Sequence, residues 1–211
     1  MPSSSTGYHH GDLRAACLRA AMELLEDDGA AGLSVRAVAR RAGVSPGAPY
    51  RHYADRDALV SAVAAEGYRE LAGYLSAAHA SPSTPEDLAA VAVAYVQFAL
   101  EHRALFRTMF SDPCDGDSTE RVAATTAIAE YVGALVRRAF PDADPDALST
   151  ALWAVVHGLA FLYLDGKLDT STPQAVADRV RAAVLALVAV SPRHDADQLS
   201  GYVPTGFGES G

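Results

Sequence analysis

A group of basic side chains near the N-terminus carries the clearest chemistry in this sequence. Between residues 29 and 54 there is no acidic residue, and the basic residues are Arg36, Arg40, Arg41 and Arg51. A guanidinium group donates two parallel hydrogen bonds from a planar fork, which suits phosphate oxygens and the edge of guanine. The arginines therefore predict a surface that binds DNA.

Small residues and further hydrogen-bond donors accompany these arginines. Ser45, Gly47 and Ala48 are small enough to let the backbone approach base edges in the major groove, whereas the donors that follow are within reach of the flanking phosphates. These donors are Tyr50, His52 and Arg56.

Two short helices joined by a tight turn are expected to position these side chains. Ser34 is a candidate N-cap, and an apolar stripe with helical spacing follows it at Val35, Val38, Ala39 and Ala42. Gly43 then suits the positive φ that ends many helices. Ser45 and Pro46 favour the start of a second helix, as cap and first helical residue. This order is typical of a helix-turn-helix.

The same stretch resembles the DNA-binding signature of the TetR family of bacterial repressors. The resemblance rests on Ala42–Ser45, Tyr50–Tyr53 and Asp55–Leu59. The family commonly has phenylalanine where this chain has Tyr53 and lysine where it has Arg56, and both substitutions keep an aromatic core residue and a cation. Pro49 is a larger departure, because a proline inside the recognition helix is expected to loosen its first turn.

The resemblance implies a contact with DNA for ten residues. Phosphates would be held by Ser34, Ser45, Tyr50, His52 and Arg56. Arg36 would read guanine, and Gly47 and Ala48 would lie near thymine methyl groups. Pro46 and Arg51 complete the predicted DNA-binding set.

The net charge of −9 is unevenly distributed. Residues 1–60 carry seven basic and seven acidic side chains, so the whole excess of acid lies in residues 61–211. Local charge decides the approach to DNA because salt screens fields beyond roughly 8 Å. We expect the basic stretch to face the duplex and the acidic part to be held away from it.

The rest of the pattern predicts an all-α fold of about nine helices, with no strand. We expect an N-terminal arm and a three-helix DNA-binding head over residues 1–56, a helical ligand-binding and dimerisation body over 57–192, and a flexible tail over 193–211. Expected body helices cover residues 55–79, 85–102, 105–110, 119–140, 145–164 and 176–190. Before the helix-turn-helix, a helix capped by Asp12 is expected to end near Gly29.

Several other classes of protein are not favoured. No apolar run is expected to span a bilayer, and the N-terminus lacks the pattern of a signal peptide. Cys17 and Cys114 are the two cysteines, and their spacing predicts neither a metal site nor a disulfide. We therefore expect a cytoplasmic protein without a cofactor or metal.

A second resemblance concerns residues 153–160, whose Trp153, His157 and Gly158 are similar to a signature of one TetR subgroup. It implies that the last two helices pair with those of a second subunit. The apolar surplus on these helices supports a homodimer, and we expect its interface to include Val155, Val156, Leu159, Leu162, Tyr163, Val180, Val184, Leu187 and Val188. Two heads could then grip half-sites roughly 34–36 Å apart on a palindromic operator.

The family resemblance also implies a pocket for a small-molecule effector. Candidate wall residues are Tyr95, Phe98, Phe106, Phe110, Trp153, His157 and Phe161. Each aromatic residue could instead simply fill the core. His157 could anchor a ligand, or it could be a structural histidine bonded to a backbone carbonyl. The apolar character of the set predicts a hydrophobic ligand.

The resemblance implies a repressor that blocks transcription until ligand binding moves the helix over residues 57–79 and changes the spacing of the two heads. Only a difference in ligand affinity between the two states can drive such a shift. One alternative is a DNA-binding protein of the same fold that senses no ligand. Another is an all-helical enzyme with His157 as base, although no nucleophile–base pair, metal set or phosphate loop supports it.

Overall fold

The computed structural model describes residues 10–79, 81–110 and 118–190. Within these residues it is all-α, as predicted, with eight α-helices, one 3-10 turn and no strand. The elements are α1 (His10–Gly32), α2 (Val35–Arg41), η1 (Pro49–Arg51), α3 (Arg56–Ala78), α4 (Pro85–Glu101), α5 (Arg103–Phe110), α6 (Thr119–Ala139), α7 (Pro145–Leu164) and α8 (Pro173–Val190). The predicted tail over 193–211 and Cys114 lie outside the described residues.

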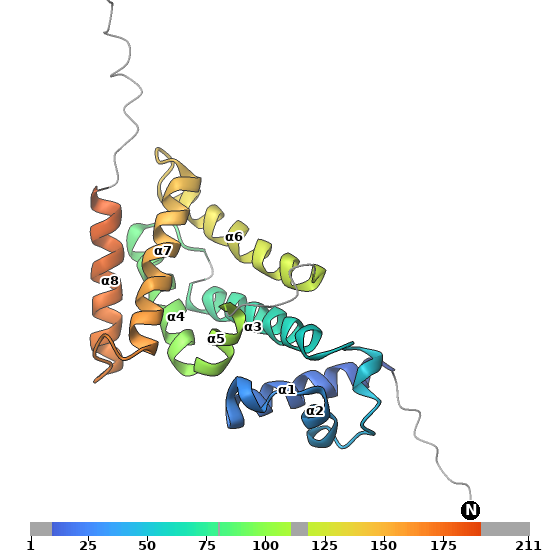
Figure 1. The fold of residues 1–211 in the computed structure, drawn as a ribbon. Helices are drawn as coiled ribbons and strands as arrows, with labels where there is room; N and C mark the ends of the chain where they lie inside the picture. The colour runs from blue at the N-terminus through green and yellow to red at the C-terminus, as the bar shows by residue number, and fades with distance from the viewer. Residues whose placement is uncertain (1–9, 80, 111–117, 191–211) are drawn as a thin grey trace, which may run out of the picture.

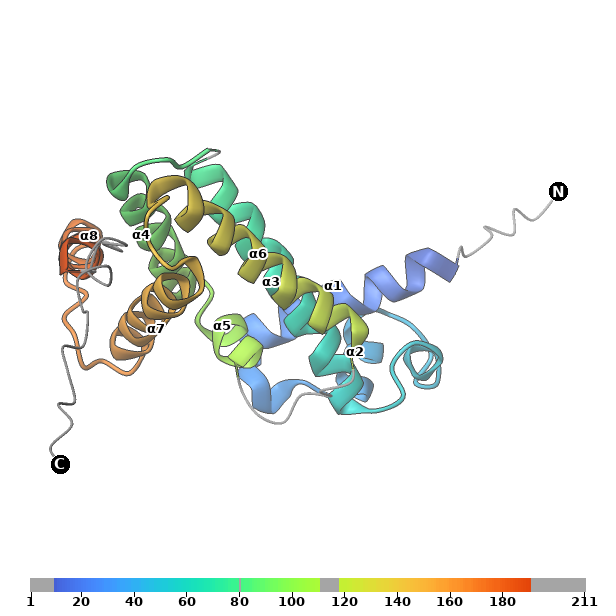
Figure 2. The same ribbon diagram turned by 90° about the horizontal axis from the view of Figure 1, so that it is seen from above.

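Helices α1 and α2 and the η1 turn form one end of the molecule, and α7 and α8 lie at the other (Figure 1). Helix α3 runs from the α1/α2 end into the body, where α4 and α5 pack beside it. The view from above shows α6 lying along α3 (Figure 2). A single long helix thus connects the two ends.

Capping side chains explain why the long helices begin where the sequence predicts. The Asp55 carboxylate accepts from Ala58 N at 2.8 Å at the start of α3. Thr84 and Asp87 form a reciprocal capping box at the start of α4, with Pro85 in its first turn. Asp144 caps α7 by accepting from the backbone N–H groups of Asp146 and Ala147, again just before a proline. Helix α1 is different, because it already begins at His10 and Asp12 therefore lies inside it.

Buried apolar residues form a continuous core from Leu13 in α1 to Val184 in α8. Helix α3 approaches α5 closely at Gly67. A Cβ atom at this position would lie 2.7 Å from Met109 Sδ and 2.9 Å from Leu105 Cδ1. A side chain at residue 67 would therefore displace the Met109 and Leu105 side chains of α5 from this contact.

Helix α7 corrects the expectation that no apolar run could span a bilayer. Its 20 residues reach a mean hydropathy of 1.7, and about a third of that window is buried inside the protein. By length and composition α7 is sufficient for a membrane span, but an apolar core helix meets the same criterion. Its contacts with α4, α6 and α8 are those of a packed helix in a bundle.

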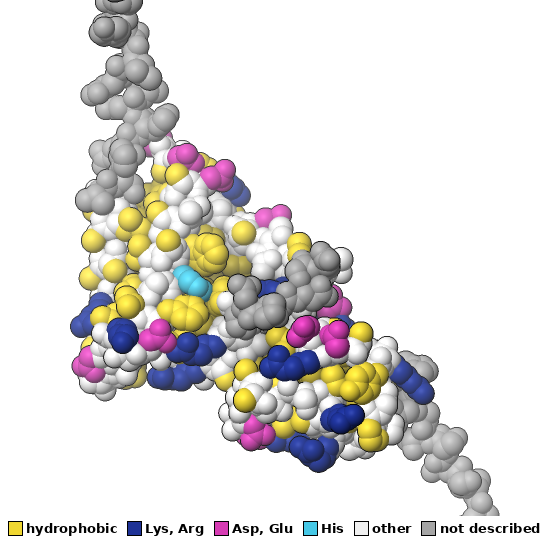
Figure 3. Space-filling model, viewed as in Figure 1, with side chains coloured by type: hydrophobic (Ala, Val, Ile, Leu, Met, Phe, Trp, Pro, Cys, Tyr) yellow, Lys and Arg dark blue, Asp and Glu magenta, His cyan; other side chains and the backbone are white. Residues whose placement is uncertain are grey.

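The structure also corrects part of the predicted dimer interface. Four of its residues are buried within the protomer, so their side chains offer no surface to a second copy: Val156, Tyr163, Val180 and Val184. Leu162 is 43% exposed and Trp153, on the same helix, is 55% exposed. Val155, Leu159, Leu187 and Val188 are half-buried. Hydrophobic side chains are visible over α7 and α8 on the face shown in Figure 3.

Candidate nucleic-acid interface and ligand cavity

Helix α2 and its turn match the first half of the predicted helix-turn-helix. Ser34 Oγ accepts a hydrogen bond from Ala37 N at 3.2 Å and so caps α2. Gly43 has φ of 68°, a conformation that glycine adopts without strain, and Val44 N then donates to Ala39 O at 3.0 Å. The sequence predicted both the cap and the glycine turn.

The second helix of the motif is not an α-helix, which corrects the prediction from Ser45 and Pro46. Ala48 N donates to Ser45 O at 2.9 Å in a turn, and only Pro49–Arg51 is helical, as the 3-10 element η1. An α-helix starting at Pro46 would need a backbone N–H at residue 49 to bond to Ser45 O. Pro49 lacks that N–H, so its effect extends beyond the loosened first turn that the sequence predicted.

The predicted DNA-binding residues around η1 differ in their exposure. Tyr50 is 47% exposed, and the exposed backbone before it includes Gly47. Ser45, Pro46 and Arg51 are also exposed, whereas Ala48 and His52 are half-buried. His52 Nε2 is buried without a hydrogen-bond partner among the described residues. In this conformation, Tyr50 and Arg51 are therefore better placed than His52 to reach a phosphate.

The arginines of this end fall into two groups. Arg36, Arg40 and Arg51 are exposed, and within the described part of the chain they form no hydrogen bond or ion pair. Arg41 instead lies 2.9 Å from Asp27 and 3.5 Å from Glu23 of α1. Three of the four predicted basic groups are thus available to a polyanion, while the fourth is neutralised by acids of its own chain.

Arg56 has a structural role that the sequence did not indicate. Its guanidinium donates to Ala30 O at 2.9 Å and to Leu33 O at 3.1 Å. These carbonyls lie where α1 ends, just after the kink at Gly29, and carbonyls at a helix end lack partners in the helix. Arg56 therefore fixes the start of α3 to the end of α1, and its role as a phosphate ligand stays a prediction.

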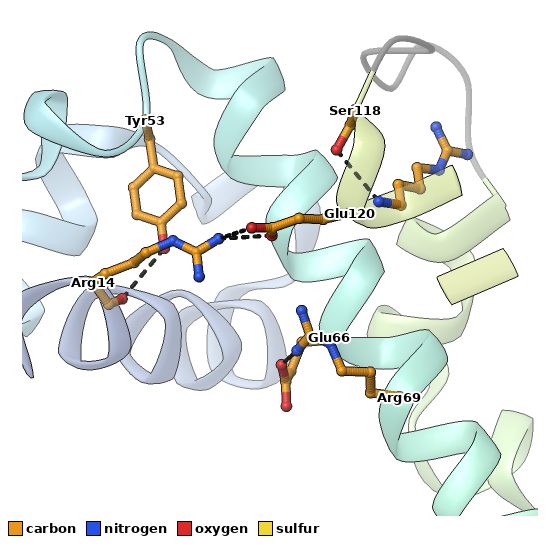
Figure 4. Close-up of polar contacts among 7 residues, drawn as sticks. Arg14, Tyr53, Glu66, Arg69, Ser118 and Glu120 are labelled. Carbon is orange, nitrogen blue, oxygen red and sulfur yellow. Dashed lines mark hydrogen bonds and ion pairs between the residues drawn. The ribbon is translucent and has the colours of Figure 1, made fainter. Parts of the chain in front are cut away.

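A polar contact connects α1 to the body (Figure 4). The Tyr53 hydroxyl donates to the backbone carbonyl of Arg14 at 3.3 Å, and burial raises the pKa of this tyrosine. The Arg14 guanidinium lies 2.6 Å from both carboxylate oxygens of Glu120, in the first turn of α6. Arg14 of α1 therefore contacts both ends of this connection. Its backbone carbonyl binds Tyr53, the core aromatic residue of the helix-turn-helix, and its side chain binds α6.

A cavity of about 450 Å³ lies between α3, α4, α5, α6 and α7. Tyr95, Phe110 and Trp153 of the predicted ligand set line it. The other lining residues are Tyr68, Leu71, Thr125, Thr126, Ile128, Ala129, Val132, Ser149 and Thr150. A smaller cavity of about 60 Å³ shares Tyr95 and Trp153 with it and is lined by apolar side chains.

His157 packs behind the cavity wall. Its Nδ1 is 2.9 Å from the Tyr95 hydroxyl, so this nitrogen is paired with a side chain and not with a backbone carbonyl, the partner that one of the two alternatives gave it. Its ring centroid is 4.4 Å from that of Phe110 and 4.8 Å from that of Phe161. Burial lowers the pKa of His157 and raises the pKa of Tyr95. Both groups are therefore held neutral, and His157 orients Tyr95.

Two other predicted ligand residues serve the core. Phe106 is fully buried and packs edge-on against Tyr95, with ring centroids 5.5 Å apart. Phe98 packs against Tyr74 and His102, which are not among the cavity-lining residues. The alternative that single aromatic residues fill the core is therefore the better description of these two positions.

Sequence reasoning missed the hydroxyl groups that line the cavity. Thr125 and Thr126 lie on α6, and Ser149 and Thr150 lie on α7. Serine and threonine are common on the exposed faces of helices, so a single sequence offers no signal that these four meet. Only the packing of α6 against α7 brings them together.

Two family models match this chain. The model described as "Bacterial regulatory proteins, tetR family" covers residues 18–63. The model described as "Tetracyclin repressor-like, C-terminal domain" covers residues 88–187. The first match contains α2 and η1, and the second contains the α4 to α8 body with most of the cavity wall.

Individual proteins give the same picture. An HTH-type transcriptional regulator of Mycobacterium tuberculosis is 34% identical over 95 residues, which are 44% of this chain and 41% of that protein. The match thus spans less than half the length of this curated relative. A solved structure of a protein with unknown function from Rhodococcus sp. RHA1 is 35% identical, with a TM-score of 0.72, and covers 86% of this chain and 97% of its own. A tetR-family regulatory protein from Rhodococcus RHA1, at 21% identity and a TM-score of 0.63 over 83% of this chain and 96% of its own, shares the fold.

Proposed function

Because this chain belongs to the tetR family of bacterial regulatory proteins, we propose that it is a repressor that binds a palindromic operator as a homodimer. Membership makes the chain a transcriptional regulator. The observation that carries the proposed binding to DNA is the set of exposed, unpaired arginines on the helix-turn-helix, Arg36, Arg40 and Arg51. The subgroup suggested by Trp153 and His157 stays a prediction. We propose that the protein acts in the bacterial cytoplasm, where the DNA is.

We propose that residues 1–56 act as the DNA-binding head and residues 57–192 as the ligand-binding and dimerisation body. In the head, Arg36 reads bases, whereas Tyr50 and Arg51 hold phosphates on either side. Gly47 supports the close approach of the backbone, because nothing lies within 4 Å of a Cβ atom at that position. Charge distribution supports the same division, since residues 1–60 are neutral overall and residues 61–211 carry the acidic excess.

The homodimer is supported by the apolar surface of α7 and α8. Leu162 and Trp153 are exposed, and the half-buried Leu159, Leu187 and Val188 extend the same helices. Removing such a surface from water is favourable at about 25 cal/mol per Å² of apolar area. A second copy of this pair of helices is the natural cover, because it offers the same surface in return.

Regulation by a ligand is supported by the cavity and its connection to the head. Helix α6 contributes Thr125 and Ile128 to the cavity wall and Glu120 to the contact with Arg14. Helix α3 contributes Leu71 to the same wall and reaches the helix-turn-helix at Arg56. A ligand that separates α6 from α3 would therefore move the head, provided that it binds the displaced state more tightly.

Two alternatives are less well supported. A ligand-independent protein of this fold would need no cavity, so an opening of about 450 Å³ beside Trp153 counts against it. An enzyme using His157 as base would need a reacting group beside it, and its neighbours are aromatic rings and the Tyr95 hydroxyl. The curated relative from Mycobacterium tuberculosis is named as a transcriptional regulator, and we propose no reaction for this chain.

Selection of binding sites from random duplexes by the purified protein tests the proposal. We expect a palindromic consensus whose affinity falls with salt, because phosphate neutralisation releases counterions. Arg36→Ala should lower affinity by about 1–3 kcal/mol and relax one base position, whereas Tyr50→Ala should weaken all sites alike. Arg181→Ala is the matched control, because its arginine pairs with Asp178 on α8. Unchanged affinity in both head variants would defeat the assigned DNA roles.

The oligomeric state is tested separately by analytical ultracentrifugation. We expect a dimer at micromolar concentration and a monomer after Leu162→Glu, which places a charge in an apolar interface. Val122→Glu is the control, because Val122 is a similarly exposed apolar residue on α6. A wild-type protein that sediments as a monomer, or a Leu162→Glu variant that remains a dimer, would contradict the proposed interface.

A further inference from the structure

The cavity wall is uncharged. Of the described residues that line it, none carries a carboxylate, an ammonium, a guanidinium or an imidazole group, and burial raises the pKa of Tyr95. A carboxylate or ammonium group placed here would give up part of its hydration without gaining an opposite charge. The volume of about 450 Å³ is in the ordinary range for a small-molecule site. The wall therefore favours a neutral molecule.

The hydroxyl groups of the wall are mostly committed as donors. Thr125 Oγ1 donates to the α6 backbone carbonyl of Val122 at 2.9 Å, and Thr150 Oγ1 donates to Asp146 O at 2.8 Å. The Tyr68 hydroxyl donates to Met109 O at 3.1 Å. A hydroxyl that has given its proton away can only accept from a further partner. Toward the cavity, these three groups therefore act as hydrogen-bond acceptors.

Two hydroxyl groups of the wall have no hydrogen-bond partner among the described residues; that of Thr126 is on an exposed residue, so Ser149 is the buried exception in this wall. Its Oγ atom is buried and has no hydrogen-bond partner among the described residues. An unsatisfied buried hydroxyl is costly, which makes it a ready partner for a polar group in the cavity. It lies on α7 one turn before Trp153, whose ring forms the adjacent apolar wall.

We infer that the cavity binds an uncharged, largely aromatic molecule with one hydroxyl or N–H group, and that Ser149 is the hydrogen-bond partner of that group. The inference rests on the proposed ligand-regulated function and names the chemical class of its ligand. Three acceptors and one unsatisfied hydroxyl complement a donor on the ligand. The rings of Tyr68, Tyr95, Phe110 and Trp153 supply the apolar contact for the rest.

A matched series of biphenyls tests this class on the full-length protein. The probes are 4-hydroxybiphenyl, 4-methoxybiphenyl, biphenyl-4-carboxylate and biphenyl-4-yl-trimethylammonium, which share the biphenyl body and differ in the charge, hydrogen-bond capacity and size of the substituent. Calorimetry gives each affinity. Tryptophan emission reports on the location of binding, because Trp153 is the single tryptophan of the sequence and lines the cavity.

We expect 4-hydroxybiphenyl to bind most tightly and 4-methoxybiphenyl to bind about two- to tenfold more weakly, the value of one hydrogen bond. Both ions should bind at least about a hundredfold more weakly. The trimethylammonium probe is the sharpest comparison, because aromatic walls also attract cations. If either ion binds as tightly as the hydroxyl compound, or if 4-hydroxybiphenyl does not bind, the inferred class is wrong.

Ser149→Ala isolates the assigned partner. It should reduce the affinity for 4-hydroxybiphenyl to that of 4-methoxybiphenyl and leave the methoxy compound unchanged. Ser76→Ala is the control, because Ser76 is an exposed serine of α3 that donates to Ala72 O. Equal affinities in the two variants would overturn the role of Ser149.

DNA binding by the same preparation separates this inference from the proposed function. Retention of selected duplexes without binding of 4-hydroxybiphenyl would overturn the ligand class alone. Failure to bind any duplex would overturn the regulator as proposed, even if the probe binds. Binding of both, with the duplex released as 4-hydroxybiphenyl is added, is the expected result.

Discussion

The helix-turn-helix segment and the cavity are built in opposite ways. Residues 34–56 are continuous in sequence, and their caps, turn and exposed arginines are set by neighbours a few residues away. The cavity draws its wall from five helices, and its lining extends from Tyr68 to Trp153. The first is a local pattern that one sequence can display. The second exists only when distant helices pack, so its polar groups are determined by tertiary structure.

The largest expected effect on stability concerns the core that packs against the cavity wall. Phe106→Ala should lower the free energy of unfolding by about 3–5 kcal/mol, because Phe106 is fully buried against Tyr95 and its truncation leaves a void. Urea denaturation followed by circular dichroism measures the loss. Phe140→Ala is the control, since Phe140 is only half-buried and should cost much less. Similar losses in the two variants would show that Phe106 does not support the cavity.

A smaller effect is expected in the head. Tyr53→Phe keeps the buried ring and removes only the hydroxyl that donates to Arg14 O, so it should cost about 0.5–1.5 kcal/mol. The free energy of unfolding from urea denaturation gives the cost, and the affinity for selected duplexes should change little. Tyr50→Phe is the control, because Tyr50 is exposed and its hydroxyl is proposed to serve DNA. It should leave stability unchanged and weaken DNA binding.

The pH dependence of stability tests the burial of His157 behind the cavity wall. The pKa of His157 is lowered by burial from an ordinary value of 6.5, so below that pH the unfolded state binds more protons than the folded state. The stability that depends on a neutral His157 is fully present above about pH 6.5, and it is lost as the pH falls through the lowered pKa of the folded state. His157→Gln should flatten this dependence by less than about 1 kcal/mol, because the ring is only half-buried. Urea denaturation of both proteins at pH 7.5 and 5.5 measures the difference; parallel losses would contradict the assignment.

The smallest expected effect on stability concerns the contact that joins the two regions. Glu120→Gln should cost at most about 1 kcal/mol, because both Glu120 and Arg14 are largely exposed. Its effect should instead appear in coupling, as a weaker influence of 4-hydroxybiphenyl on DNA affinity. Asp178→Asn, which breaks a similar exposed pair within α8, is the control for charge removal. If 4-hydroxybiphenyl changes the DNA affinity of Glu120→Gln as much as that of the wild type, the Arg14–Glu120 contact does not connect the cavity to the head.

What the sequence predicted follows the same division. Capping residues such as Ser34, Asp55 and Asp144 fixed the helix starts, because a cap acts on its own first turn. Pro49 has a larger effect than the sequence predicts, because the family resemblance implies a recognition helix that this chain does not complete. The apolar pattern of α7 and α8 showed which residues avoid water. It could not show which of them face α4 and which remain for a second copy, and Val156 and Val180 were misplaced for that reason.

The contact at Gly67 has a mechanical consequence. Gly67 lies midway along α3, eleven residues from Arg56 at one end and eleven from Ala78 at the other. Gly67 packs closely against α5, and Leu71 in the cavity wall lies one turn beyond it, so a movement of α3 about this contact would have Leu71 on one side and Arg56 on the other. With a rise of about 1.5 Å per residue, Leu71 lies about 6 Å from Gly67 along the helix axis, and Arg56 lies about 16 Å from it in the other direction. A rigid α3 pivoting there would magnify a push on Leu71 nearly threefold at the start of the head.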